Sequence, residues 1–147
     1  MGEQSHGPVL SFVVRHAWLS MRSAIETELA EFGLTSPRFA TLMMIATSPG
    51  LSAAQVARSC GSTRQAANEM LTALEREGLI TRSPHATDRR THQLHITPLG
   101  TKRYEEALPA VLRREAALEE GLTPEQREAA RTWMSAVTAA SRQPPEK

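Results

Sequence analysis

A cluster of hydrogen-bonding side chains occupies positions 62–69, directly after Gly61. Serine and threonine hydroxyls, together with the free N–H groups at the start of a helix, bind phosphate. Arginine pairs with the major-groove edge of guanine, and glutamine or asparagine pairs with that of adenine. The side chains of this cluster are Ser62, Thr63, Arg64, Gln65, Asn68 and Glu69. They predict a helix surface that contacts DNA, with an ordinary solvated helix face as the alternative.

A second polar segment, residues 83–90, lies between two short stretches whose residue pattern predicts β-strands. The segment is therefore expected to be the loop of a hairpin. Asp88 favours a turn and could also pair with an arginine, while Arg89 and Arg90 could enter the minor groove of DNA. Arg82, in the preceding strand, is a further candidate for DNA contact. A solvated charged turn is the alternative explanation.

The sequence offers no residues for catalysis or for a metal site. It contains no motif in which two carboxylates, or a nucleophile and a base, are placed for catalysis, and no glycine-rich phosphate loop, so we expect neither an enzyme nor a cofactor. His92 and His95 are three positions apart in a predicted strand, so their side chains point to opposite faces and cannot bind one metal ion together. The single cysteine, Cys60, is expected to be a small buried apolar residue rather than a redox sensor.

The composition predicts a globular protein of a reducing compartment. The 147 residues are 40% hydrophobic and 22% charged, as in an ordinary globular domain. The sequence has no apolar stretch that could span a bilayer, no secretory signal and one cysteine, so we expect a cytoplasmic protein with no membrane partner. The net charge is +1, and residues 52–97 hold six basic and four acidic side chains. Any DNA contact must therefore depend on a few well-placed groups.

Apolar periodicity and helix-capping residues predict the elements that position these groups. Apolar residues at three- or four-residue spacing predict a long first helix, and Ser36 is expected to be the N-cap of the second, with Pro37 in its first turn. Ser52 and Thr123 each begin a capping box. The expected order is helices 8–32, 36–47, 52–59 and 62–78, strands 79–82 and 93–97, and helices 98–120 and 124–142. The residues of the fourth helix expected to face inward are Ala66, Met70, Leu71 and Leu74.

Several short motifs resemble, in this order, the MarR family of bacterial regulators. They are LSAAQVA (51–57), STRQAA (62–67), LEREGLI (74–80), DRR (88–90), LHITPLG (94–100) and LTPE (122–125), and the resemblance covers nearly the whole chain. It implies a mainly α winged helix-turn-helix with a small β-hairpin wing, which dimerises through its N- and C-terminal helices. It also implies a pseudo-palindromic DNA operator, a wing in the minor groove, and repression relieved by a small, often aromatic, anion. Two residues depart from the family pattern: Glu69 stands where a neutral or basic residue is more usual, and Cys60 where a leucine is.

We therefore expect a single domain, residues 1–147, that forms a homodimer. Residues 8–32 and 98–142 are predicted to be the dimerisation helices, and residues 36–97 the DNA-binding lobe. Apolar stripes in both outer helices are most easily buried against a second copy. The alternative function is a winged-helix module that binds protein, which the near-neutral middle third of the chain and Glu69 favour.

A ligand cleft is expected where the long first helix meets the DNA-binding lobe. Tryptophan and methionine would supply apolar walls, and arginine or histidine would bind an anion. The candidate lining residues are Arg15, His16, Trp18, Arg22, Arg38, Phe39, Met43 and Met44. The alternative is that Trp18 and the methionines belong to the core or to a dimer interface.

Overall fold

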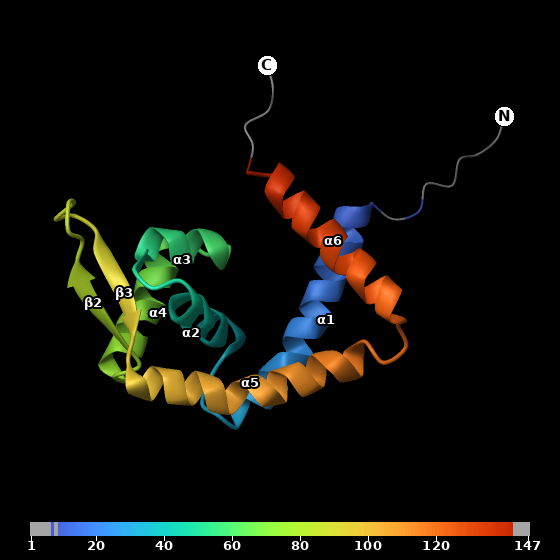
Figure 1. Ribbon diagram of the computed structural model, residues 1–147, viewed down its shortest axis with the longest axis horizontal. Coiled ribbons are helices and arrows are strands. Elements are labelled where there is room, and N and C mark those ends of the chain that lie inside the picture. Colours follow the sequence, from blue (N-terminus) through green and yellow to red (C-terminus); the bar gives the residue numbers. More distant parts are fainter. Residues whose placement is uncertain (1–6, 8, 143–147) are drawn as a thin grey trace, which may run out of the picture. The chain divides into compact units, whose positions relative to one another are not determined.

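The computed structural model describes residues 7 and 9–142 and is mainly helical (Figure 1). The elements are α1 (Leu10–Ala30), α2 (Ser36–Thr47), β1 (Leu51–Ser52), α3 (Ala53–Ser59), α4 (Arg64–Arg76), β2 (Ile80–Pro84), β3 (His92–Ile96), α5 (Pro98–Leu118) and α6 (Pro124–Ala140). One compact unit extends to Arg114 and a second begins at Glu115, so α5 belongs to both. The predicted mainly α fold with a β-hairpin is confirmed. We call the hairpin, residues 80–96, the wing.

The core of the first unit collects apolar side chains from α1 to α5 and from both strands of the wing. The fully buried side chains include Leu29, Leu42, Ile45, Val56, Leu71, Leu74, Leu79, Ile80 and Leu94. Burial of such side chains contributes roughly 1.5–3 kcal/mol each relative to exposure. Since α4 packs on this core through Leu71 and Leu74, its opposite, polar face stays in solvent.

The sheet has three antiparallel strands in the order β1-β3-β2. Leu94 of β3 lies opposite both Leu51 of β1 and Arg82 of β2. The sequence predicted only the hairpin, because two residues are too few for β1 to show an alternating pattern. The strands are also longer at the loop than predicted: Pro84 pairs with His92, so the connecting loop is 85–91 rather than 83–90.

Helix α2 is capped differently from the prediction. Its N-cap is Thr35, whose side chain accepts no capping hydrogen bond, and Ser36 is already helical. The Ser36 N–H instead donates to Glu26 Oε1 of α1 at 3.0 Å. The predicted N-cap at Ser36 is therefore wrong, and a carboxylate from the preceding helix satisfies the free N–H. This contact ties the start of α2 to α1.

The other helix boundaries largely follow the sequence signals. Both predicted capping boxes, at Ser52 and Thr123, are confirmed. Helix α1 ends at Ala30, slightly earlier than predicted, and the predicted start at Pro8 lies outside the described residues. The expectation that Ala66 faces inward is wrong, because Ala67 is the residue that α4 turns into the core.

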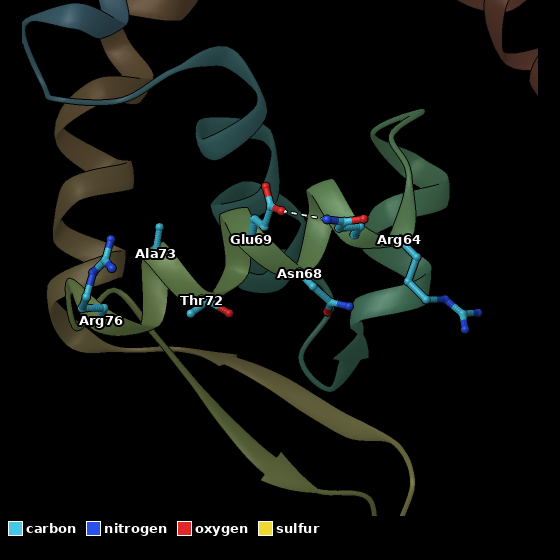
Figure 2. Close-up of a pocket in the computed structure, with 7 residues that line it drawn as sticks. Arg64, Asn68, Glu69, Thr72, Ala73 and Arg76 are labelled. Carbon is cyan, nitrogen blue, oxygen red and sulfur yellow. Dashed lines mark hydrogen bonds between the residues drawn. The ribbon is translucent and has the colours of Figure 1, made fainter.

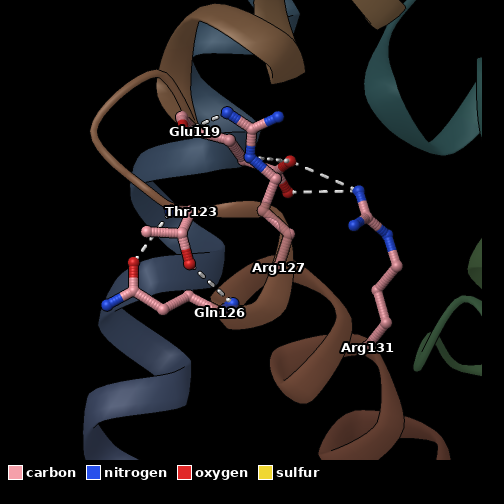
Figure 3. A network of polar contacts seen from close by, with 5 residues as sticks. All are labelled: Glu119, Thr123, Gln126, Arg127 and Arg131. Carbon is pink, nitrogen blue, oxygen red and sulfur yellow. Dashed lines mark hydrogen bonds and ion pairs between the residues drawn. The ribbon is translucent and has the colours of Figure 1, made fainter.

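The second unit is built around the turn between α5 and α6 (Figure 3). Glu119 accepts ion pairs from Arg127 at 3.7 Å and from Arg131 at 3.3 Å, and Arg127 Nη2 also donates to the Glu119 carbonyl at 2.9 Å. Together with the Thr123 capping box, these contacts fix the start of α6. Further along α6, three apolar side chains are exposed: Trp133, Met134 and Val137. None of the helices within residues 9–142 combines the length and the apolar composition of a membrane-spanning segment.

Candidate nucleic-acid interface

Helices α3 and α4 are joined by a tight turn that points the start of α4 into solvent. Gly61 has φ +60°, a left-handed conformation that glycine adopts without strain. Thr63 then caps α4, because its Oγ1 accepts the Ala66 N–H at 3.1 Å. Ser62 and Thr63 are both exposed beside the free N–H groups of the first turn. This arrangement can bind an anion such as a phosphate.

A shallow groove runs along the exposed face of α4. We call it the α4 groove; it is lined by Arg64, Gln65, Asn68, Glu69, Thr72, Ala73 and Arg76. Figure 2 shows Arg64, Asn68 and Glu69 projecting from the first turns of the helix. Gln65 Nε2 donates to Glu69 Oε1 at 3.2 Å, one helical turn away. The four residues Arg64, Gln65, Asn68 and Glu69 of the predicted cluster therefore share one accessible surface.

A second hollow joins α4 to the wing. It is lined by Ser52, Ala53, Ala54, Arg64, Asn68, Arg82, Arg90, Thr91, His92 and Leu94. Arg64 and Asn68 line both this hollow and the α4 groove. The fold thus brings together the two polar segments that the sequence singled out.

Asp88 shapes the loop of the wing. Its Oδ1 accepts the Arg90 backbone N–H at 3.0 Å, and its Oδ2 accepts the Thr91 hydroxyl at 2.9 Å. These two hydrogen bonds, the first of them above all, hold the pKa of the Asp88 carboxyl below its usual value, and the nearby His85 adds to the effect. Of the two roles considered for Asp88, turn formation is confirmed, and Asp88 makes no ion pair within the described residues. Its neighbours Arg89 and Arg90 stay exposed.

Arg82 connects the wing to α4. Its Nε lies 3.2 Å from Glu75 Oε2, and its Nη2 donates to Thr72 Oγ1 at 3.2 Å. The sequence predicted Arg82 as a DNA contact but did not predict these intramolecular partners. They bind the first strand of the wing to the C-terminal half of α4, and so fix the distance between the two candidate DNA-contacting segments.

A cleft of about 540 Å³ lies between α1, the start of α2 and α4. We call it the arginine cleft; it is lined by Arg22, Thr35, Pro37, Arg38, Cys60, Gly61, Ser62, Ala66, Met70 and Ala73. Of the residues predicted to line a ligand cleft, it brings together Arg22 and Arg38. Cys60 is half-buried in its wall, not fully buried as predicted.

The other predicted cleft residues lie elsewhere in the first unit. Phe39 is buried in the core, with its ring 5.5 Å from that of Tyr104. His16 lies against Phe12 at 4.6 Å between ring centroids. The remaining four, which do not line the arginine cleft, are Arg15, Trp18, Met43 and Met44. Of these, Trp18 and Met43 are exposed, and Met44 packs against the core.

Both arginines of the cleft already have carboxylate partners. Arg22 Nε lies 3.6 Å from Glu26 Oε1, the oxygen that also accepts the Ser36 N–H. The Arg38 guanidinium pairs with the Glu77 carboxylate at the C-terminal end of α4. The first pair is linked to the start of α2 through the hydrogen bond from Ser36 to Glu26, and the second lies at the end of α4. No local sequence pattern predicts the pair between Arg38 and Glu77, which are 39 positions apart.

Comparison with known proteins gives this geometry a context. A protein-family sequence model described as "MarR family" matches residues 32–91. The HTH-type transcriptional repressor Rv2887 of Mycobacterium tuberculosis is 33% identical over 129 residues, which cover 87% of this chain and 92% of the relative. The chain belongs to the MarR family. The HTH-type transcriptional repressor YetL of Bacillus subtilis is a more distant relative, 27% identical over 74% of this chain and 66% of its own length.

Solved structures of MarR-family proteins share the fold. Rv2887 of M. tuberculosis in complex with salicylic acid matches with a TM-score of 0.75 and 28% identity, covering 90% of this chain and 98% of that one. The transcriptional repressor CouR bound to a 23-mer DNA duplex matches with a TM-score of 0.80 and 27% identity, covering 94% and 98%. A MarR-family regulator from Rhodococcus matches in fold with a TM-score of 0.83 at 18% identity. The winged helix-turn-helix fold that the motifs implied is confirmed.

Proposed function

We propose that this MarR-family chain is a homodimeric repressor that binds a pseudo-palindromic DNA operator. The observation that carries the proposal is the hollow lined jointly by Arg64 and Asn68 of α4 and Arg90 of the wing. A helix that enters the major groove and a hairpin that reaches the adjacent minor groove need this side-by-side placement. The related repressor CouR was solved bound to a 23-mer DNA duplex, which supports DNA as the partner.

Each segment has a proposed role in DNA recognition. Ser62 and Thr63 bind phosphate at the start of α4, and Arg64, Gln65 and Asn68 contact base edges in the major groove. Arg89 and Arg90 enter the minor groove, where the negative potential favours arginine. Asp88 shapes their loop, and Arg82 holds the wing against α4.

We propose that dimerisation uses the helices at both ends of the chain. The domain assignment stays as predicted: 8–32 and 98–142 dimerise, 36–97 is the DNA-binding lobe, and the whole is a single domain. Leu10, Phe12 and Trp18 of α1 and Trp133 of α6 expose large apolar side chains. Surfaces of this kind mark association sites, and a two-fold dimer matches the two halves of a palindrome.

We propose that a small anion, aromatic in character, relieves repression by binding in the arginine cleft. Arg22 and Arg38 supply positive charge there, and Met70 supplies an apolar wall. The structure of the related Rv2887 contains salicylic acid, a ligand of this chemical class. The chain is proposed to act in the cytoplasm by binding alone, without catalysis.

The test is DNA affinity at two salt concentrations, by fluorescence anisotropy with a duplex taken from upstream of its own gene. We expect tighter binding to this duplex than to an unrelated one of equal length. If about six phosphates are contacted, affinity falls about a thousandfold between roughly 50 and 200 mM salt.

The alternative, a winged-helix module for a protein partner, is favoured by the small charge excess of residues 52–97. It would give weak binding that does not depend on the DNA sequence.

A further inference from the structure

Glu69 is the one acidic residue among the side chains that line the α4 groove. The groove also contains Arg64 and Arg76, yet no ion pair within the described residues includes the Glu69 carboxylate. Its one hydrogen bond in that part of the chain comes from Gln65 Nε2, at 3.2 Å. An exposed carboxylate repels the DNA phosphates, so Glu69 weakens the non-specific part of DNA binding. A second role is needed to explain its place on this face.

The hydrogen bond to Glu69 fixes the orientation of the Gln65 amide. One of the two N–H bonds of Nε2 points at the carboxylate, and the reverse orientation would place two acceptor oxygens against each other. This leaves Gln65 with one free N–H and with its carbonyl oxygen. The two groups match the N7 acceptor and the N6 amino donor of adenine. They cannot satisfy guanine, which presents two acceptors at this edge.

Glu69 itself is left with acceptor capacity only. A carboxylate has about four lone-pair sites on its two oxygens, and the bond from Gln65 occupies one of them. In the major groove, the amino groups of cytosine and adenine are the donors that it could bind. The keto oxygens of guanine and thymine would meet it with like partial charge. The carboxylate therefore favours a base with an amino group and disfavours one with a keto group.

From this geometry we infer that Glu69 is a base-specificity determinant of the operator, acting with Gln65. The inference rests on the proposed function, since it requires that α4 enter the major groove. Gln65, held by Glu69, reads adenine. Glu69 accepts a hydrogen bond from the amino group of a cytosine or adenine at a neighbouring base pair. Together, Glu69 and Gln65 lower the affinity for DNA in general and raise the discrimination between DNA sequences.

Selection of DNA from a randomised duplex library, followed by sequencing, tests the inference. Wild-type protein is expected to enrich adenine at one position of each half-site and an amino-bearing base beside it. Glu69→Gln keeps the size of the side chain but offers a donor as well as an acceptor, and it frees the Gln65 amide to turn. It is expected to lose the enrichment at these two positions by roughly tenfold or more, with the rest of the motif unchanged. Gln65→Ala is expected to lose the adenine preference.

A matched control separates this effect from a change of net charge. Glu106→Gln removes one negative charge from α5, where Glu106 pairs with Lys102 at 3.8 Å, and should leave the selected motif unaltered. Anisotropy should also show that Glu69→Gln binds an unrelated duplex more tightly than wild type does. A motif that is identical for wild type and Glu69→Gln overturns the inference alone. If the wild-type protein enriches no motif, the proposed function fails and the inference fails with it.

Discussion

The Asp88 side chain is exposed, and its carboxylate accepts two hydrogen bonds that order the wing loop. These bonds hold its pKa below the usual value of 3.8. The ionised form is thus favoured in the folded loop, and its contribution to loop order is fully present above the unfolded pKa. That contribution is lost as the pH falls through the lower pKa of the folded state.

This behaviour predicts the acid titration of the wing. We expect an NMR titration to show the Asp88 carboxyl still mostly ionised at pH 3.8, where an unperturbed aspartate is half protonated. The Arg90 amide resonance should move with the same midpoint, because its N–H donates to Asp88. In Asp88→Ala the midpoint at Arg90 should disappear. A midpoint at or above the usual aspartate value would contradict this account of the loop.

Gly100 carries a second prediction at the scale of one residue. A Cβ at this position would lie 2.0 Å from the Leu79 carbonyl oxygen and 2.8 Å from Ile96 Cγ1, so α5 approaches the wing at a distance that only glycine permits. Gly100→Ala is expected to cost about 3 kcal/mol of unfolding free energy, the upper end of typical overpacking. Gly121→Ala is the control, because nothing lies within 4 Å of its Cβ position. Urea denaturation measures both, and equal midpoints would refute the argument.

Some of the site could be predicted from single residues and some could not. The role of Asp88 as a turn former depends on neighbours in the chain, and it was predicted. The hydrogen bond between Gln65 and Glu69 could have been predicted from their spacing of four on a helix, but it was not among the predictions. The pairing of Arg38 with Glu77 depends on how two distant helices pack, which no local pattern encodes.

For helices and strands, the same contrast between local and distant contacts explains which elements could be predicted from the sequence. The capping boxes of α3 and α6 are local, so both helix starts were placed correctly. The short strand β1 exists because Leu51 and Ser52 pair with β3, some forty positions further along the chain. The start of α2 is capped by Glu26 from another helix. Elements that depend on such partners were missed or misassigned.

The ion pair between α2 and α4 makes a prediction about ligand binding. An anion in the arginine cleft would compete with Glu77 for the Arg38 guanidinium. With salicylate as a probe of the proposed anion site, Glu77→Gln removes the competitor and is expected to raise the affinity for the probe by roughly twofold to fivefold, the equivalent of an ion pair of about 0.5–1 kcal/mol. Glu75→Gln, which instead breaks the pair with Arg82, is the control and should leave the affinity unaltered. Isothermal titration calorimetry measures both, and unchanged binding in Glu77→Gln would exclude the competition.

For the molecule as a whole, the proposed operator binding requires a second copy of the chain. Val137 lies on the face of α6 that exposes Trp133 and Met134. Val137→Glu is expected to shift the protein from dimer to monomer in light scattering, since it places a charge in an apolar interface. Operator affinity should fall as well, because a monomer binds one half-site without a second copy bound at the other. Ser135→Glu adds the same charge to the opposite face of the helix and should remain dimeric. A dimeric Val137→Glu would place the interface elsewhere.

Every prediction about DNA depends on the proposal that α4 and the wing bind a specific duplex as a symmetric pair. A hydroxyl-radical footprint of the wild-type protein, on the duplex that it selects from the randomised library, tests this proposal. We expect two protected half-sites with centres about one helical turn apart, flanked by protection of the minor groove where the wings lie. Protection that is absent, or spread evenly along the duplex, would contradict it.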